Sequence, residues 1–251
     1  MSDHTDRKAE MKAVWETSFQ HQIARGAYNT APVEALVRTV AYHLRARYQP
    51  DDYPNLHFCE AGCGAGPNLR WLAEKGIKVS GVDISGQALQ LAHELLDGSG
   101  RVGQLLEGSV TELPFADETF DGVLEACVFQ HLTRDERKKA FNEVRRVLKP
   151  GGIFVGYQLG DRHTTFQAQR DRELPDDPGT VQLVDESNKS GFNLETIGLA
   201  HFFSRGEYAD LLDGFSVKEP LDSTYELPAE EAQRRGYDHY LQHMWIVHAV
   251  K

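Results

Sequence analysis

The chain has 251 residues, of which 40% are hydrophobic and 26% are charged, and its formal net charge is -11. This length fits one α/β domain with additions, or less well two small domains, and the composition is that of an ordinary globular protein. The acidic balance disfavours a general nucleic-acid binder, which would carry a basic stripe, and favours a small-molecule or protein partner.

Cysteine content and the first residues indicate the compartment. The chain has three cysteines, an odd and sparse number that argues against a disulfide framework and for a reducing environment. Cys59 and Cys63 have no second Cys/His pair at matching spacing, so no metal site is expected. Residues 1–12 are polar, and no apolar run approaches the ~20 residues that span a bilayer. We therefore predict a cytoplasmic protein that contacts no membrane.

Two helices are predicted before the first strand. Apolar residues recur on one side of residues 7–22, and a second helix begins near Pro32. Such helices either close over a ligand site or cover an edge of a sheet. We predict that residues 1–50 form a helical lid, in which Trp15, Phe19 and Tyr28 are candidate lid residues, although core packing is the alternative role for these aromatic side chains.

The most informative stretch is a glycine turn between a strand and a helix. Residues 56–59 read as a strand, the turn holds Gly62, Gly64 and Gly66, and residues 68–74 read as a helix. Only glycine lets the backbone approach a ligand closely and adopt positive φ. The glycine spacing differs from the dinucleotide signature, and no Gly-Lys-Ser/Thr follows, so neither a dinucleotide nor a nucleoside triphosphate is the expected ligand.

Strands and helices then alternate along the chain. Strands are predicted at 78–82, 102–106, 120–124 and 153–157, separated by helices at 85–96 and 133–148 and by a turn-rich connector. Late strands follow at 215–217 and 244–250. This order predicts an α/β fold with a Rossmann-like, doubly wound, seven-stranded sheet that is mostly parallel and ends in an antiparallel strand.

Residues 160–202 interrupt this alternation of strands and helices. They are polar and lack clear periodicity, as is typical of a functional loop or cap. The predicted organisation is therefore a lid formed by residues 1–50, followed by a ligand-binding domain formed by residues 51–251. Within that domain, residues 160–202 form a cap that holds substrate.

The carboxyl ends of the parallel strands should meet at one edge of the sheet, where α/β proteins bind ligands. Asp83 ends the second strand, 23 residues after Glu60, in the place where a carboxylate accepts hydrogen bonds from a ribose diol. Such a charge-assisted contact contributes roughly 1.5–3 kcal/mol. The alternative is a solvated aspartate at a strand end.

Five motifs in this order resemble the class I S-adenosylmethionine-dependent methyltransferases, in particular their type 11-like, small-molecule group. The resemblance covers about residues 56–159, and its motifs lie at residues 60–66, 81–85, 108–115, 120–132 and 147–152. It implies a methyltransferase that uses S-adenosylmethionine, and the spacing of the remaining histidines adds no metal site. It says little about the methyl acceptor.

The resemblance also implies roles for the matching positions. Asp83 would bind the ribose, Ile84 would pack on the adenine, and Ser109 and Val110 would lie at the adenine edge. Ser109 stands where the family often has aspartate. The methionine portion would lie against the glycine turn and the end of the fourth strand, at Glu60, Ala61, Gly62, Cys63, Gly64, Gly66, Glu125 and Ala126.

A sulfonium methyl group is already activated, so such an enzyme mainly aligns the acceptor and excludes water. His131, just after the fourth strand, is the candidate general base for an oxygen acceptor, with a structural role as its alternative. We predict methyl transfer to an oxygen or nitrogen of a small metabolite held between residues 1–30 and 160–202. The alternatives are a non-catalytic S-adenosylmethionine-binding protein, a nicotinamide-dependent oxidoreductase, or a macromolecular acceptor.

Overall fold

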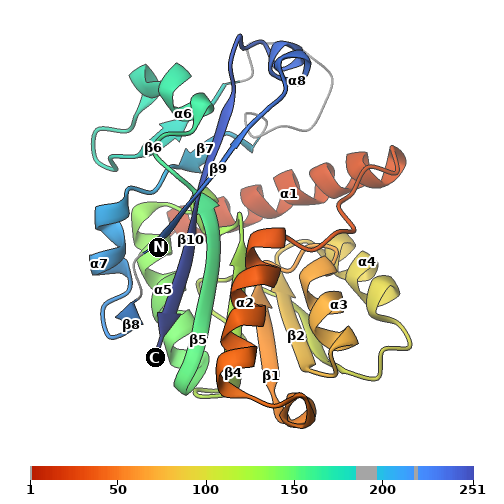
Figure 1. Ribbon diagram of the computed structural model, residues 1–251. Helices are drawn as coiled ribbons and strands as arrows, with labels where there is room; N and C mark the ends of the chain where they lie inside the picture. The colour runs from red at the N-terminus through yellow and green to blue at the C-terminus, as the bar shows by residue number, and fades with distance from the viewer. Residues whose placement is uncertain (1, 185–196, 218–219) are drawn as a thin grey trace.

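A computed structural model describes residues 2–184, 197–217 and 220–251 of the chain. One twisted sheet forms its centre, with helices on both faces (Figure 1). The strands of this sheet, in spatial order, are β3 (Val102–Glu107), β2 (Lys78–Asp83), β1 (His57–Ala61), β4 (Phe120–Ala126), β5 (Leu148–Leu159), β10 (Leu241–Val250) and β8 (Ser216–Val217). A further strand, β9 (Leu221–Glu226), also pairs with β10.

The α-helices are α1 (Ser2–Ala24), α2 (Glu34–Arg47), α3 (Pro67–Glu74), α4 (Gly86–Leu96), α5 (Arg134–Val147), α6 (Thr164–Ala168), α7 (Tyr208–Leu211) and α8 (Ala229–Arg234). Short 3-10 helices are η1 (Pro50–Asn55), η2 (Phe129–His131), η3 (Arg170–Arg172) and η5 (Arg205–Glu207).

The predicted fold class is confirmed. Strands β1 to β5 pair in parallel, and β10 runs antiparallel to β5. Both faces of the central strands are buried, since the neighbouring residues Val123 and Leu124 of β4 belong to apolar clusters on opposite faces. Burial on both faces explains why these strands read as apolar runs in the sequence.

The helix starts follow local chemistry. The Ser85 hydroxyl caps α4 by accepting a hydrogen bond from Ala88 N, and Thr133 and Glu136 form a reciprocal capping box at the start of α5. Both helices begin within one residue of the starts predicted from the sequence. Helix α2 instead begins at Glu34, two residues after the predicted start, with no side-chain cap.

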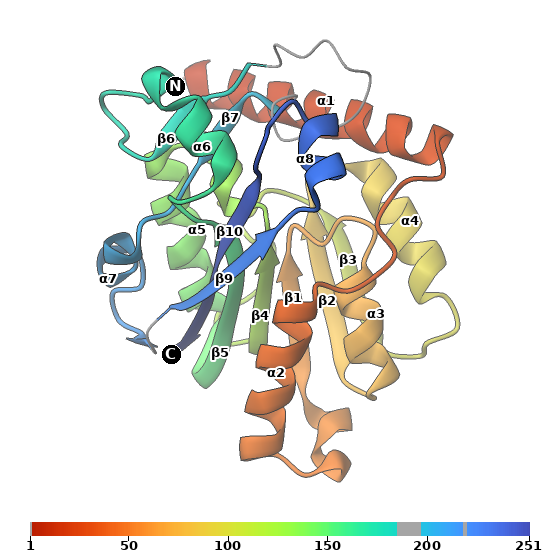
Figure 2. The same cartoon turned by 45° about the horizontal axis from the view of Figure 1, so that its top comes forward.

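The two N-terminal helices have different positions. Helix α2 lies alongside the sheet and buries Leu36, Val40 and Leu44 against it. Helix α1 runs across the end of the sheet, above the carboxyl ends of the parallel strands (Figures 1 and 2). Helix α2 is therefore part of a helical layer beside the sheet, whereas α1 lies over the strand ends.

Three segments differ from the sequence prediction. β9 was not predicted, because nearly all of its residues are exposed and it shows no burial pattern. β5 begins at Leu148, before its predicted start, and a register shift against β4 accommodates the extra residues. The predicted cap contains α6, η3 and an antiparallel pair formed by β6 (Thr180–Gln182) and β7 (Leu199–His201), while residues 185–196 lie outside the described part.

Among the described residues, no helix is both long and apolar enough to cross a membrane.

Candidate active site

A cavity of about 710 Å³ lies between the carboxyl ends of the parallel strands and α1. One wall comes from the glycine turn after β1, the end of β2, the segment after β3 and the loop after β4. The opposite wall is α1, which contributes Arg7, Lys8, Met11, Trp15, Phe19 and Gln22. Tyr28, also predicted as a lid residue, is not among the lining residues. The sheet geometry thus brings together side chains from four separate strand ends.

Most of the predicted site residues line this cavity. They are Glu60, Gly62, Cys63, Gly64, Asp83, Ile84, Ser109, Val110, Ala126 and His131. The predicted residues Ala61, Gly66 and Glu125 are not among the lining residues. Ala61 is wholly buried in the core, and the Cα of Gly66 lies so close to α4 that an added Cβ would be 3.1 Å from Ala92 Cβ.

Glu125 holds the loop after β4. Its Oε1 accepts hydrogen bonds from Val128 N at 2.6 Å and Phe129 N at 3.1 Å, and its Oε2 accepts one from Gln158 Nε2 at 2.8 Å. Burial raises the pKa of this carboxyl to about 7, although the three hydrogen bonds oppose the shift. Both oxygens of this carboxylate therefore already accept hydrogen bonds from within the protein.

The glycine turn lies against this same loop. Gly62 has φ +79°, and a Cβ added to it would be 2.3 Å from Val128 Cγ2. Gly64 has φ +50°, and a Cβ added to it would be 3.5 Å from Phe19 Cζ of α1. A side chain at position 62 would therefore collide with the loop after β4 in addition to straining the backbone.

Asp83 joins the end of β2 to the turn. Its Oδ2 accepts a hydrogen bond from Gly64 N at 2.8 Å, and its Oδ1 accepts one from Ser85 N at 2.9 Å. The side chain is buried, and burial raises its pKa, although the hydrogen bonds from Ser85 and Gly64 oppose this shift. Each carboxylate oxygen retains a second lone pair for another donor.

Glu60 is a buried carboxyl with one unused acceptor. Its Oε1 accepts a hydrogen bond from Asn68 Nδ2 at 2.6 Å, while its Oε2 has no hydrogen-bond partner among the described residues. Burial raises the pKa of Glu60 to about 8, and the nearby Asp83 and Glu125 add to the shift, which the Asn68 contact opposes.

Asn68 was not predicted as a site residue. It lines the cavity, holds Glu60 and accepts a hydrogen bond from Val33 N at 2.8 Å, so it also ties the segment before α2 to the site. The signal in the sequence was a polar residue in the first turn of the helix that follows the glycine turn, and the structure shows that this residue is buried.

Hydrogen bonds fix the protonation of His131. Its Nδ1 lies 2.9 Å from Leu199 O, which can only accept, so Nδ1 carries the proton. Gln130 Oε1 accepts from Leu159 N, which leaves Gln130 Nε2 as the donor to His131 Nε2 at 3.3 Å. Burial lowers the pKa of His131 to about 4 against the opposing effect of the Leu199 contact. The ring is therefore neutral at pH 7.

Helix α1 contacts the site along its length. Arg7 Nη2 donates to His131 O at 3.3 Å, and Glu16 Oε1 accepts from Gly86 N at 2.7 Å at the start of α4. The Trp15 ring meets the His131 ring edge-on, with centroids 5.5 Å apart. None of the described residues in 160–184 or 197–202 lines the cavity, contrary to the expected substrate contacts of the cap, and residues 185–196 lie outside the described part.

Across the described ranges, no group of three or more His, Cys, Asp and Glu residues is arranged to hold a metal ion.

The fold and the cavity define a class of protein: an α/β domain with a cavity over the carboxyl ends of its parallel strands, the place where such folds bind their ligands. The profile of the methyltransferase domain family matches residues 59–156. An uncharacterized methyltransferase of Geobacillus kaustophilus is 30% identical over 192 residues, which cover 76% of this chain and 75% of that protein. The chain belongs to the class I S-adenosylmethionine-dependent methyltransferases.

Solved structures share the fold. A SAM-dependent methyltransferase of Methanosarcina mazei aligns with TM-score 0.64 and 22% identity, covering 83% of this chain and 96% of that one. The 1,6-didemethyltoxoflavin-N1-methyltransferase of Burkholderia thailandensis, with bound 1,6-didemethyltoxoflavin and S-adenosylhomocysteine, aligns with TM-score 0.59 and 20% identity over 97% of this chain and 89% of that one.

The matches to longer relatives are partial. The chain spans 37% of the length of each of two such proteins, a sterol methyltransferase-like protein of Botryococcus braunii and a sterol 4-C-methyltransferase of Caenorhabditis elegans.

Proposed function

We propose that this methyltransferase transfers the methyl group of S-adenosylmethionine to an oxygen or nitrogen of a small molecule held beneath α1. The observation that carries the proposal is the cavity of about 710 Å³ between α1 and the strand ends, a volume within the roughly 300–1,000 Å³ of small-molecule sites. The structural neighbour from Burkholderia thailandensis holds a small molecule together with S-adenosylhomocysteine, which supports the proposal by analogy.

The cavity-lining residues fit the cofactor. Glu60 offers an unpartnered oxygen to the cationic amino group of the methionine portion, beside the glycine turn. Asp83 offers its remaining lone pairs to the ribose hydroxyls, and Ile84 offers an apolar surface to the adenine. Ser109 replaces the aspartate that is common in the family, and its hydroxyl lies 2.7 Å from Thr111 Oγ1.

The bound cofactor supplies the activated methyl group, and the residues of the chain bind, orient and exclude water. Orientation of this kind can lower a barrier by about 7–11 kcal/mol. We propose that α1 is the lid, because it covers the cavity and is hydrogen-bonded to both the loop after β4 and the start of α4. Trp15 and Phe19 would then close over the reacting groups.

For an oxygen acceptor, His131 is the candidate base, acting through Nε2 after the acceptor hydroxyl displaces Gln130. Replacement by alanine or asparagine is then expected to lower kcat about 100-fold or more while the affinity for S-adenosylhomocysteine stays unchanged. The asparagine variant separates the two roles, since its side-chain amide can still donate to Leu199 O but cannot act as a base. A near-normal kcat in His131→Asn would leave His131 only its structural contact with β7.

The proposed function can be tested by ligand binding and by turnover. S-Adenosylhomocysteine at 100 times its dissociation constant should add about 2.7 kcal/mol to the unfolding free energy, and NAD should add none. Release of S-adenosylhomocysteine should then appear with one member of a panel of small hydroxyl- and amine-bearing metabolites. Stabilisation by NAD alone would overturn the cofactor assignment, and turnover only with tRNA or protein would overturn the small-molecule acceptor.

A further inference from the structure

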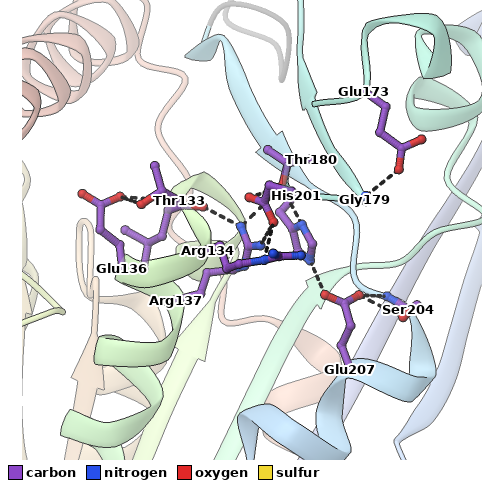
Figure 3. A network of polar contacts seen from close by, with 12 residues as sticks. Thr133, Arg134, Glu136, Arg137, Glu173, Gly179, Thr180, His201, Ser204 and Glu207 are labelled. Atoms are coloured by element: carbon purple, nitrogen blue, oxygen red, sulfur yellow. Dashed lines mark hydrogen bonds and ion pairs between the residues drawn. The ribbon is translucent and has the colours of Figure 1, made fainter. Parts of the chain in front are cut away.

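The buried guanidinium of Arg137 joins the loop after β4 to the segment that the sequence marks as a cap. Arg137 lies in α5, and its side chain is 3% exposed. Its Nη1 donates to Leu132 O at 2.8 Å, and its Nη2 donates to Asp177 Oδ1 at 2.6 Å. Figure 3 shows this side chain reaching from α5 toward Thr180 and His201 of the β6–β7 pair.

The partner of Arg137 is itself held in place. Thr180 Oγ1 donates to Asp177 Oδ2 at 2.7 Å and lies 2.8 Å from His201 Nδ1, while His201 Nε2 lies 2.9 Å from Glu207 Oε1 (Figure 3). The contacts thus run from α5 through β6 and β7 to η5. Burying two charges costs solvation free energy, and the attraction between them often does not offset this cost. A buried ion pair such as Arg137–Asp177 therefore need not stabilise the fold, and another role has to be considered.

The loop that Arg137 contacts is a wall of the cavity. Val128, His131 and Leu132 all line it. The β6–β7 pair reaches this loop a second time, because Leu199 O of β7 accepts the Nδ1 proton of His131. The Arg137 contact fixes the backbone at Leu132, and the Leu199 contact fixes the His131 ring. Together they fix the position of the loop relative to the β6–β7 pair.

We propose that Arg137 is a positioning residue, which, through its ion pair with Asp177, holds residues 128–132 and the His131 ring in place as a wall of the active site. The described part of the 160–202 segment would then affect the reaction by fixing the position of residues 128–132, although it does not line the cavity itself. The expected effect on catalysis rests on the proposed function. The effect of Arg137 on the rigidity of residues 128–132 can be measured without turnover.

The test replaces Arg137 by methionine, which removes both donors but keeps much of the side-chain volume, in the full chain with S-adenosylhomocysteine as the probe. Amide exchange of residues 128–132 should become about 10-fold faster or more, because the charge-assisted hydrogen bonds to Leu132 O, Thr180 Oγ1 and Asp177 Oδ1 are lost. Nitrogen-15 NMR of the His131 ring should show loss of the single Nδ1-protonated form. Once an acceptor is known, kcat should fall more than the affinity for the cofactor.

Arg134→Gln is the matched control. Arg134 Nε lies 3.6 Å from the same Asp177 oxygen, but its side chain is 52% exposed and has no hydrogen bond to residues 128–132 in the described structure. This variant should leave the loop exchange and the His131 signals as in the wild type. Asp177→Asn provides a second route to the same effect if Arg137→Met does not fold.

The proposal is overturned if folded Arg137→Met or Asp177→Asn protein keeps wild-type exchange at residues 128–132 and a wild-type His131 spectrum. It is equally overturned if Arg134→Gln changes these readouts as much as they do. Wild-type protein that fails to bind S-adenosylhomocysteine would instead count against the proposed function, so the two failures are distinguishable.

Discussion

Replacing Asp83 by alanine is expected to weaken the binding of S-adenosylhomocysteine about 100-fold. Two losses combine: the proposed charge-assisted hydrogen bonds to the ribose, worth roughly 1.5–3 kcal/mol, and the observed hydrogen bonds from Gly64 N and Ser85 N. A loss of about 2.8 kcal/mol corresponds to that factor at 25 °C. Titration calorimetry at pH 7.5 measures the effect directly.

Asp121 provides the matched control for this variant. Its carboxylate also accepts a backbone hydrogen bond from a neighbouring strand, from His57 N at 2.9 Å, and it pairs with Lys149 at 2.8 Å. It lies at the opposite end of the sheet, near the start of β4. Asp121→Ala should lower the unfolding temperature without changing the affinity for S-adenosylhomocysteine. Wild-type affinity in Asp83→Ala, or an equal loss in Asp121→Ala, would remove the ribose role.

Replacing Glu60 by glutamine is expected to stabilise the ligand-free protein at alkaline pH. Burial raises the pKa of Glu60 in the folded chain to about 8, from an ordinary value of 4.5. The folded state therefore holds a proton that the unfolded state has lost, so this group's contribution is fully present below pH 4.5 and is lost as the pH rises through 8. Each pKa unit corresponds to about 1.4 kcal/mol, and glutamine has no such proton to lose.

The same substitution is expected to weaken cofactor binding. A cationic amino group beside Glu60 lowers its pKa, so binding near pH 7 should release a proton, and affinity should rise between pH 6 and pH 8. Calorimetry in two buffers of different ionisation enthalpy measures this release. Glu60→Gln should release no proton from this site and should bind S-adenosylmethionine about 10-fold more weakly or worse, because the charge-assisted contact is lost.

Glu125→Gln is the control for Glu60. Glu125 is equally buried, and burial raises its pKa to about 7, but it does not line the cavity. Glutamine can still accept from Val128 N and Phe129 N through Oε1, and a flip of the Gln158 amide lets Gln158 Oε1 accept from the new Nε2 while Tyr208 OH accepts from Gln158 Nε2. Cofactor affinity and proton release should therefore stay as in the wild type. Unchanged binding in Glu60→Gln would refute the role of Glu60. A loss in Glu125→Gln as large as in Glu60→Gln would support the cofactor contact predicted for Glu125 from the sequence.

Local patterns in the sequence sufficed for the order of β1 to β5, for the helices α3, α4 and α5 between them, and for the strand ends that meet at the cavity. The apolar runs of the central strands, the capping box at Thr133 and Glu136, and the glycine turn before α3 all depend on short-range sterics, hydrogen bonds and burial. Asp83 could be placed in the site because the carboxyl ends of parallel strands share one edge.

Only the tertiary structure decided which way buried side chains turn and which distant segments meet. The sequence could not show that Glu125 holds its own loop while Glu60 keeps a free acceptor, since both lie near the carboxyl end of a buried strand. It could not separate α1 over the cavity from α2 in the helical layer, or find β9, which is held by pairing with β10 and shows no burial pattern. The bond between Arg137 and Asp177 joins residues 40 positions apart. Such contacts depend on long-range packing, which no local pattern encodes.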